Sequence, residues 1–136
     1  MQRFIRDNKT NIVMDNQTGL MWQDEYYTDE EKQNFSLNKS HGKVLDWHKA
    51  VEYACNLRLG GYDDWRLPTQ DEILSIVDKS RVPAIDALFQ NVVLDGYWTF
   101  TTVENILSRA WFTNFYHGHN GMYDKSFSFY IRCVRG

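Results

Sequence analysis

One short segment, from Gly61 to Glu72, constrains the fold more than any other part of the sequence. It has the sequence GYDDWRLPTQDE, and the Gly60–Gly61 pair at its start supplies the positive backbone angles that end a helix. Pro68 then fixes the backbone in front of Thr69, which forms a capping box with Glu72. In this pattern each residue's side chain bonds the other's backbone amide at a helix N-terminus. The segment therefore predicts the end of one helix and the start of the next.

Apolar residues recur at helical spacing on both sides of this segment. The stripe from Val44 to Leu57 predicts a helix over about residues 42–59, with Ser40 as its N-cap. The capping box predicts a second helix from Thr69 onward. A short third helix is predicted over Pro83–Phe89.

Segments rich in β-branched and aromatic residues lie at both ends of the chain and predict strands. Strands, then helices, then strands are typical of an α+β domain with an antiparallel sheet. Residues 24–40 are polar and without period, which predicts a long loop. Its acidic run from Asp24 to Glu31 is interpreted as solvated, with a cation or partner site as the alternative. The expected strands cover residues 3–7, 11–15, 20–23, 97–102, 110–117 and 126–135.

Length and charge exclude several classes of protein. A chain of 136 residues has the usual size of one domain, so we predict a single domain over residues 1–136. The net charge is −3 and the basic residues are scattered, which argues against nucleic-acid binding. No stretch has the length and apolarity of a membrane span, and the N-terminus lacks the apolar region of a signal peptide. We expect a soluble chain, and the missing signal does not assign a compartment.

The two cysteines are Cys55, in the first predicted helix, and Cys133, in the last predicted strand. If that helix packs on that strand, the thiols meet and a disulfide closes a long loop. Two separate buried thiols are equally compatible with the spacing. Neither cysteine belongs to a Cys-x-x-Cys motif or has a histidine at ligand spacing, so no metal or catalytic role is predicted for them.

An ordered set of motifs resembles one known family. The set consists of NIVMDNQTGLMWQ, a helix ending in AC, GGYDDWRLPTQDE, YWTFTT, AWFTNF and the terminal IRCVRG. Together these motifs are similar to the C-terminal domain family of the bacterial collagen-like adhesin Lcl, over about Asn11 to Arg135. The resemblance implies a C-type-lectin-like fold with antiparallel sheets, two main helices and long loops. It also implies kinship with the domain of formylglycine-generating sulfatase modifiers.

The resemblance carries further expectations. It implies a disulfide between Cys55 and Cys133, and a location that is extracellular, at the cell surface or periplasmic, where a disulfide persists. The adhesin that names the family looks like a homotrimer that binds sulfated glycosaminoglycans. The present chain lacks the Glu-Pro-Asn, Gln-Pro-Asp and Trp-Asn-Asp motifs of calcium-dependent lectins; the nearest strand has Trp111 to Asn114 instead. Both cysteines occupy the structural positions, so the catalytic cysteine of the formylglycine-generating relatives is not carried over.

Candidate ligand contacts lie after the strand that ends at His117, since in a lectin-like fold this loop region lies near the ligand surface. His117 and His119 would also hold a metal with Asp124 as third ligand. The glycines around them indicate an exposed loop tip instead, and no metal is predicted. Trp65 and Arg66 are interpreted as structural rather than as a sugar-stacking and sulfate-binding pair. The candidate contacts are Tyr116, His117, His119, Asn120, Tyr123 and Lys125.

These observations predict a non-enzymatic module that binds glycans, including sulfated glycosaminoglycans, or protein partners, without calcium and without a cofactor. No nucleophile elbow, phosphate-binding loop or zinc-protease motif is present in the sequence, so no catalytic residues are predicted. The alternatives are a self-associating head domain, such as a homotrimer, and a scaffold that displays variable ligand contacts.

Overall fold

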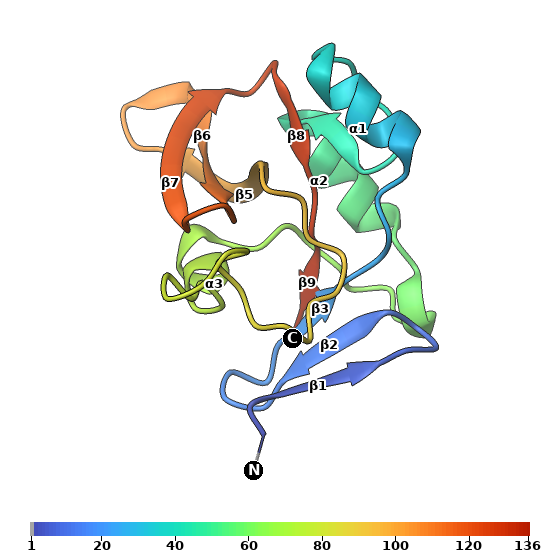
Figure 1. The fold of residues 1–136 in the computed structure, drawn as a ribbon. Coiled ribbons are helices and arrows are strands. Elements are labelled where there is room, and N and C mark those ends of the chain that lie inside the picture. Colours follow the sequence, from blue (N-terminus) through green and yellow to red (C-terminus); the bar gives the residue numbers. More distant parts are fainter. Residues whose placement is uncertain (1) are drawn as a thin grey trace.

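The N-terminal strands form a small sheet that the end of the chain completes. In the computed structural model, which describes residues 2–136, three strands run antiparallel to their neighbours: β1 (Phe4–Asp7), β2 (Ile12–Asp15) and β3 (Met21–Gln23). The short strand β9 (Val134–Arg135) pairs with β3, which gives the order β1-β2-β3-β9 (Figure 1). The two ends of the chain are therefore joined through one sheet.

A second sheet of five strands has the order β4-β8-β5-β6-β7. Its neighbours are antiparallel except for β5 and β8, which run parallel. Strand, helix and strand thus follow one another as an α+β domain, as the order of sequence patterns predicts. The strands are β4 (Val44–Asp46), β5 (Gly96–Val103), β6 (Ile106–Asn114), β7 (His119–Asp124) and β8 (Ser128–Tyr130).

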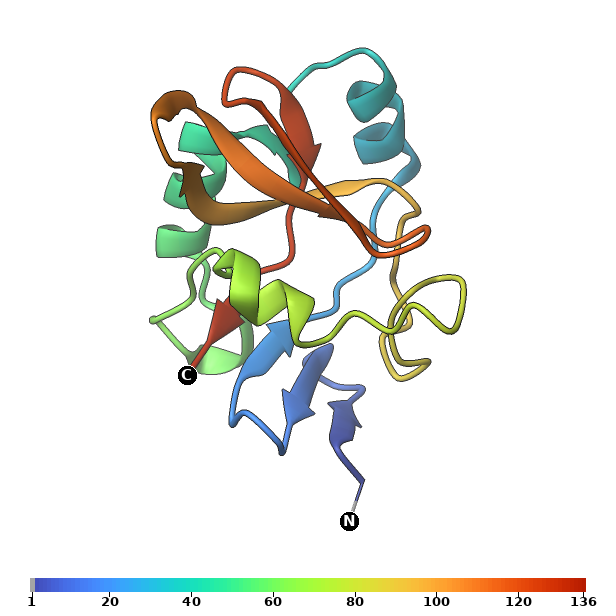
Figure 2. The ribbon, with the colours of Figure 1, turned by 90° about the vertical axis from the view of Figure 1, so that its left-hand side faces the viewer.

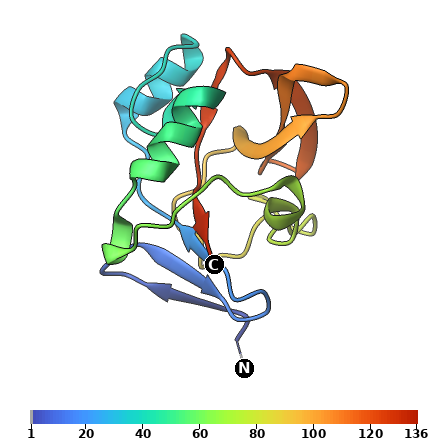
Figure 3. The same ribbon diagram turned by 180° about the vertical axis from the view of Figure 1, so that it is seen from behind.

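Three α-helices accompany the sheets: α1 (Asp29–Ser36), α2 (Trp47–Asn56) and α3 (Gln70–Leu74). A 3-10 turn over Leu59–Gly61 follows α2. Seen from behind, α1 and α2 lie on one side of β8, and α3 lies on the other side with β5, β6 and β7 (Figure 3). No helix within residues 2–136 has the length and apolarity needed to cross a membrane.

Strand β5 separates two hydrophobic clusters, because successive side chains of a strand point to opposite faces. Tyr97 is fully buried in a cluster that includes Phe115 and Trp22. Trp98, the next residue, is fully buried in a second cluster beneath α2. Its indole Nε1 donates a hydrogen bond to the Leu45 carbonyl oxygen, at 3.0 Å. The five-stranded sheet therefore has a hydrophobic cluster on each face.

The loop predicted over residues 24–40 is wrong in its middle, where α1 forms over Asp29–Ser36. The signal for this helix is present in the sequence: Thr28 and Glu31 make a capping box, the same device as Thr69 and Glu72. The periodicity is weak because most of α1 is polar and exposed, so apolar spacing alone does not reveal it. The overlooked helix α1 and the predicted helix α3 thus begin with the same local chemistry.

Other boundaries also differ from the prediction. The helix predicted over residues 42–59 begins only at Trp47, because β4 occupies the residues before it and pairs with β8. Its N-cap is Asp46, whose side chain accepts a hydrogen bond from the Lys49 amide, and not Ser40. The helix predicted over Pro83–Phe89 is wrong: this segment is irregular, with one isolated bridge.

The terminal strand predicted over residues 126–135 is divided into β8 and β9. Ile131 and the buried Arg132 carry the chain from one sheet to the other. Asn and Gly are frequent in turns, but the loop tip predicted around His117 and His119 is shorter than expected, because strand β7 already begins at His119. In the sheet, Gly121 is needed for packing, because a Cβ atom there would lie 2.6 Å from the Phe112 ring.

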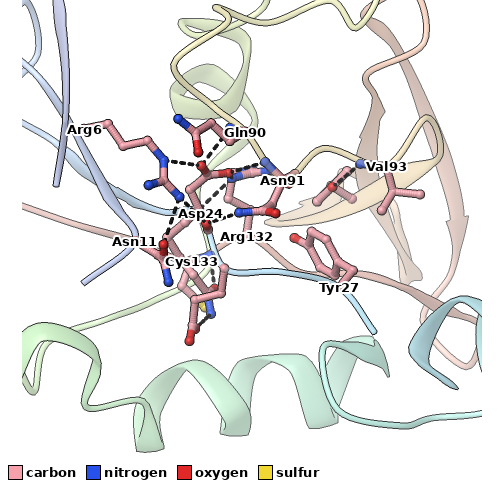
Figure 4. Close-up of polar contacts among 12 residues, drawn as sticks. Arg6, Asn11, Asp24, Tyr27, Gln90, Asn91, Val93, Arg132 and Cys133 are labelled. Carbon is pink, nitrogen blue, oxygen red and sulfur yellow. Dashed lines mark hydrogen bonds and ion pairs between the residues drawn. The ribbon is translucent and has the colours of Figure 1, made fainter. Parts of the chain in front are cut away.

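The acidic run does not behave as a solvated loop at every position. Asp24 is fully buried (0% exposed) and accepts hydrogen bonds from Arg132 Nη1 and Arg6 Nε, both at 3.0 Å (Figure 4). The backbone amides of Gln90 and Asn91 donate two further hydrogen bonds to the Asp24 carboxylate. Glu31 is also buried, and Lys43 pairs with it at 3.2 Å. Two carboxylates of the run therefore join distant segments of the chain, and neither is free to bind an external cation.

The segment from Gly61 to Glu72 begins α3 as predicted, but the glycines do not end the preceding helix. Helix α2 ends at Asn56, with Leu57 as its C-cap, and Gly60 and Gly61 lie in the 3-10 turn that follows. Gly60 and Gly61 have φ angles of 66° and 83°. Trp65 is buried, and its Nε1 donates a hydrogen bond to the Leu59 carbonyl oxygen. Arg66 makes two hydrogen bonds, of 2.6 and 2.7 Å, to the capping carboxylate of Glu72. The helix-capping glutamate is thus also the partner of Arg66.

The predicted disulfide is wrong, since Cys55 and Cys133 are both free thiols in the structure. Helix α2 does pack against the end of the chain, and Cys133 lies fully buried in the cluster that contains Ala50 and Ala54. Cys55 follows Ala54 by one residue, and one residue turns a helix by about 100°. Its side chain is therefore exposed to solvent, whereas Ala54 is buried in the contact with Cys133.

We expect one cysteine per chain to react with a thiol reagent in the native protein. Cys55 is exposed, whereas burial raises the pKa of the Cys133 thiol and shields its sulfur. Modification of Cys133 is expected to be more than about a thousandfold slower, because it requires an opening that costs several kcal/mol. The measurement is a thiol titration with and without denaturant, and Cys55→Ser is expected to remove the fast phase. Two thiols that are both unreactive until a reductant is added would contradict this structure.

Candidate functional site

The turn between β6 and β7 gathers three of the candidate side chains. The rings of Tyr116 and His117 lie edge to face with centroids 4.2 Å apart, and His119 is 6.0 Å from His117. All three side chains are exposed. Asn114 stabilises the turn, because its side-chain oxygen accepts from the Tyr116 amide and its carbonyl oxygen accepts from the Gly118 amide. The turn thus presents aromatic and imidazole rings on a defined backbone.

This turn is attached to the loop that follows α3 (Figure 2). The Ala84 amide donates a 2.7 Å hydrogen bond to the Phe115 carbonyl oxygen, one residue before the exposed rings. Gly118 has a φ of 78° and lies so close to the loop that a Cβ atom would be 2.5 Å from Val77 and 3.3 Å from Lys79. The exposed side chain of Lys79 therefore lies beside Gly118, the residue between His117 and His119.

The remaining candidates lie along β7 and not at the turn. Asn120 points to the face opposite His119, and its side-chain oxygen accepts a hydrogen bond from the Thr113 hydroxyl. Tyr123 lies four residues along the strand, on the same face as His119. Lys125 follows the far end of β7, about 20 Å from His119 at the usual strand rise. The six candidates therefore do not form one site.

Lys125 has a role of its own at that far end. Its ammonium group lies 4.1 Å from the centroid of the Trp47 ring and donates a hydrogen bond to the Thr102 hydroxyl. This contact packs the segment after β7 against the start of α2. Lys125 is thus engaged within the domain.

A shared metal site of His117, His119 and Asp124 is not formed, because Asp124 lies at the opposite end of β7 from His119. The Asp124 carboxylate instead accepts hydrogen bonds from the Ser126 side chain and backbone amide, and these lower the pKa of its carboxyl group. Among residues 2–136 no three His, Cys, Asp or Glu side chains are arranged to hold a metal ion.

Sequence reasoning located the turn through the expected placement of ligand loops, but it missed Lys79. That lysine is distant in sequence and reaches the turn only through the tertiary contact of Gly118. Gly118 and Lys79 are far apart in the sequence, and no local sequence motif indicates that they come into contact.

Comparison with known families gives one match. The family model described as the Lcl C-terminal domain matches residues 11–135, which include both sheets and the β6–β7 turn. No curated protein matched the chain.

Proposed function

The chain belongs to the Lcl C-terminal domain family, and on that premise we propose that it is a non-enzymatic module that binds glycans or protein partners without calcium. The ligand contacts are the rings of Tyr116, His117 and His119, with Lys79 beside them. The observation that carries this proposal is the attachment of the turn to the rest of the domain. Since the Ala84–Phe115 hydrogen bond and the Gly118 contact hold the turn, binding requires little ordering of the loop.

A C-type-lectin-like fold and a location outside the cytoplasm form part of the same proposal. The fold is supported by the pairing of β9 with β3, which joins the chain ends, and by the second sheet that is built between them. An experimental structure in which the last strand does not pair with β3 would contradict it. Recovery of the protein only in the cytoplasmic fraction of its source cells would contradict the location.

Sulfated glycans fit the chemistry of the turn. An ammonium group and imidazole N–H groups donate to sulfate oxygens, and aromatic rings stack on sugar faces. The net charge of −3 opposes long-range attraction of a polyanion. The attraction therefore comes from a few cations at short range, which makes binding sensitive to salt.

We expect the domain to be retained on immobilised heparin at about 50 mM salt and released by about 300 mM salt. Lys79→Glu is expected to abolish retention, because it reverses the charge beside the rings. Lys9→Glu is the matched control: it makes the same charge change on the β1–β2 turn, on the other side of the molecule (Figure 1). Absence of retention at low salt, or equal losses in the two variants, would eliminate this ligand class.

A self-associating head domain is the second candidate, supported by the β5–β6 turn. Leu107 there is 77% exposed and Ile106 is 41% exposed. Adjacent exposed aliphatic side chains are a common feature of association surfaces. Sedimentation of the isolated domain tests this candidate, and a strict monomer at high concentration would exclude it.

A further inference from the structure

A hollow of about 380 Å³ opens between α1 and the strands β5 to β8. Five aromatic rings line it, and Asp95 and two asparagines supply polar groups. Phe112 and Phe129 stack with centroids 4.7 Å apart, and Tyr123 meets Phe127 edge to face at 4.5 Å. The fifth ring, of Phe35, comes from α1. The hollow is thus aromatic and lies outside the β6–β7 turn.

Two glycines allow these rings to lie flat on the sheet. A Cβ atom on Gly96 would be 2.7 Å from the Phe129 ring, and one on Gly121 would be 2.6 Å from the Phe112 ring. Any other residue at these positions would displace the rings. The faces of the rings are therefore positioned by the backbone itself.

Asp95 lines the hollow without an internal partner. Burial raises the pKa of its carboxyl group, and no hydrogen bond or nearby cation within residues 2–136 offsets that effect. By contrast, the carboxylates of Asp15, which is buried, and Glu72, which is partly buried, each have an arginine partner. A carboxylate beside aromatic faces attracts a positive charge from outside the chain.

The cations of this chain leave these five rings free. Elsewhere, Arg and Lys side chains lie over rings, for example Lys43 over Tyr27 and Arg135 over Tyr62. Among residues 2–136 no cation lies over a ring of the hollow. The combination of ring faces and an unpaired carboxylate is therefore available to a ligand.

The hydrogen-bonding groups of the hollow select the kind of cation. A primary ammonium group has three N–H donors that need acceptors. The side-chain oxygens of Asn38 and Asn114 already accept from the Ser128 and Tyr116 amides, so among these side chains only Asp95 offers an acceptor without a partner to those three donors. A quaternary ammonium has no N–H group, and its methyl groups pack on the rings. We propose that this hollow binds a quaternary trimethylammonium group, with its charge beside Asp95.

Choline is the probe that tests this site in the unmodified full chain, by calorimetric or NMR titration. It is expected to bind at least about tenfold more tightly than 3,3-dimethylbutanol, which has the same shape with a neutral carbon in place of nitrogen. Ethanolamine, a primary amine, is expected to bind at least about tenfold more weakly than choline. Lack of saturable choline binding up to about 50 mM, or binding of either other compound as tightly as choline, would overturn the proposal.

Two variants locate the binding within the hollow. Asp95→Asn removes the charge with little change of shape, and Phe127→Leu removes one ring at the rim. Each is expected to weaken choline binding about five- to tenfold. Asp63→Asn, which makes the same change at an exposed carboxylate outside the hollow, is the control. Unchanged choline affinity in both hollow variants would overturn the assignment, whereas heparin retention tests the β6–β7 turn separately.

Discussion

An Asp24→Ala variant is expected to lose about 3–5 kcal/mol of unfolding free energy, because it leaves a buried arginine without its counter-charge. Asp24 and Arg132 are both 0% exposed, and Nη1 of Arg132 lies 3.0 Å from the carboxylate. Arg6, which is 5% exposed, loses its ion pair as well. Removing one carboxylate therefore affects two cations that water cannot reach.

The same substitution also disconnects three segments of the chain. Asp24 follows β3, and its carboxylate accepts from the Gln90 and Asn91 amides at 2.8 and 3.1 Å. Arg132 donates in turn to the Asn91 carbonyl oxygen (Figure 4). The 90–91 segment is thus held to the two ends of the chain by this one network. Its backbone amides would be left without acceptors in the variant.

Urea and thermal unfolding measure this effect, with an expected fall of about 10–15 °C in Tm for a chain of this size. Asp63→Ala, at an exposed carboxylate, is the control and is expected to change stability by less than about 0.5 kcal/mol. A loss below about 1 kcal/mol for Asp24→Ala would show that the network does not hold the segments together.

Sequence motifs predicted correctly those helix ends and strands that depend on interactions between residues close together in the chain. The capping box at Thr69 and Glu72 acts within a few residues and begins α3 where the sequence placed it. Gly60 and Gly61 do adopt positive φ angles, but in a 3-10 turn after α2 and not as the end of that helix. The strands at both ends were likewise visible as aromatic and β-branched segments. The family resemblance, which rests on the order of these segments, is confirmed by the match over residues 11–135.

Long-range contacts account for what the sequence did not reveal. Asp24 looks like part of a solvated acidic run until Arg132, far along the chain, is brought beside it. Gly121 looks like a turn residue until Phe112 packs on it. The disulfide prediction is wrong for a local reason. Helix α2 does pack against the C-terminal segment, but Ala54, and not Cys55, is buried in that contact. The candidate site was predicted only in part. The sequence indicated Tyr116, His117 and His119, whereas Lys79 reaches the turn only through the tertiary contact with Gly118.

Trp98→Ala is expected to cost about 3–5 kcal/mol, as for a large aromatic removed from a packed core. Trp98 is 0% exposed, in the five-stranded sheet. Its indole meets Phe129 edge to face at 4.7 Å, so the cavity would also loosen a ring that lines the hollow. Choline binding would weaken together with stability if the hollow depends on this packing. Urea unfolding monitored by far-UV circular dichroism measures the first effect.

A matched pair of Trp→Phe variants separates the indole hydrogen bond from the ring. Trp98 Nε1 donates to the Leu45 carbonyl oxygen, which Trp98→Phe leaves without this donor. Trp22 is also 0% exposed, but within residues 2–136 its Nε1 has no hydrogen-bond partner. Trp22→Phe removes a similar volume and also removes an unsatisfied N–H group, which is favourable. Trp98→Phe is therefore expected to cost about 1–2 kcal/mol more than Trp22→Phe. Equal losses in urea unfolding would show that the indole bond of Trp98 adds nothing to the attachment of β4 to β5.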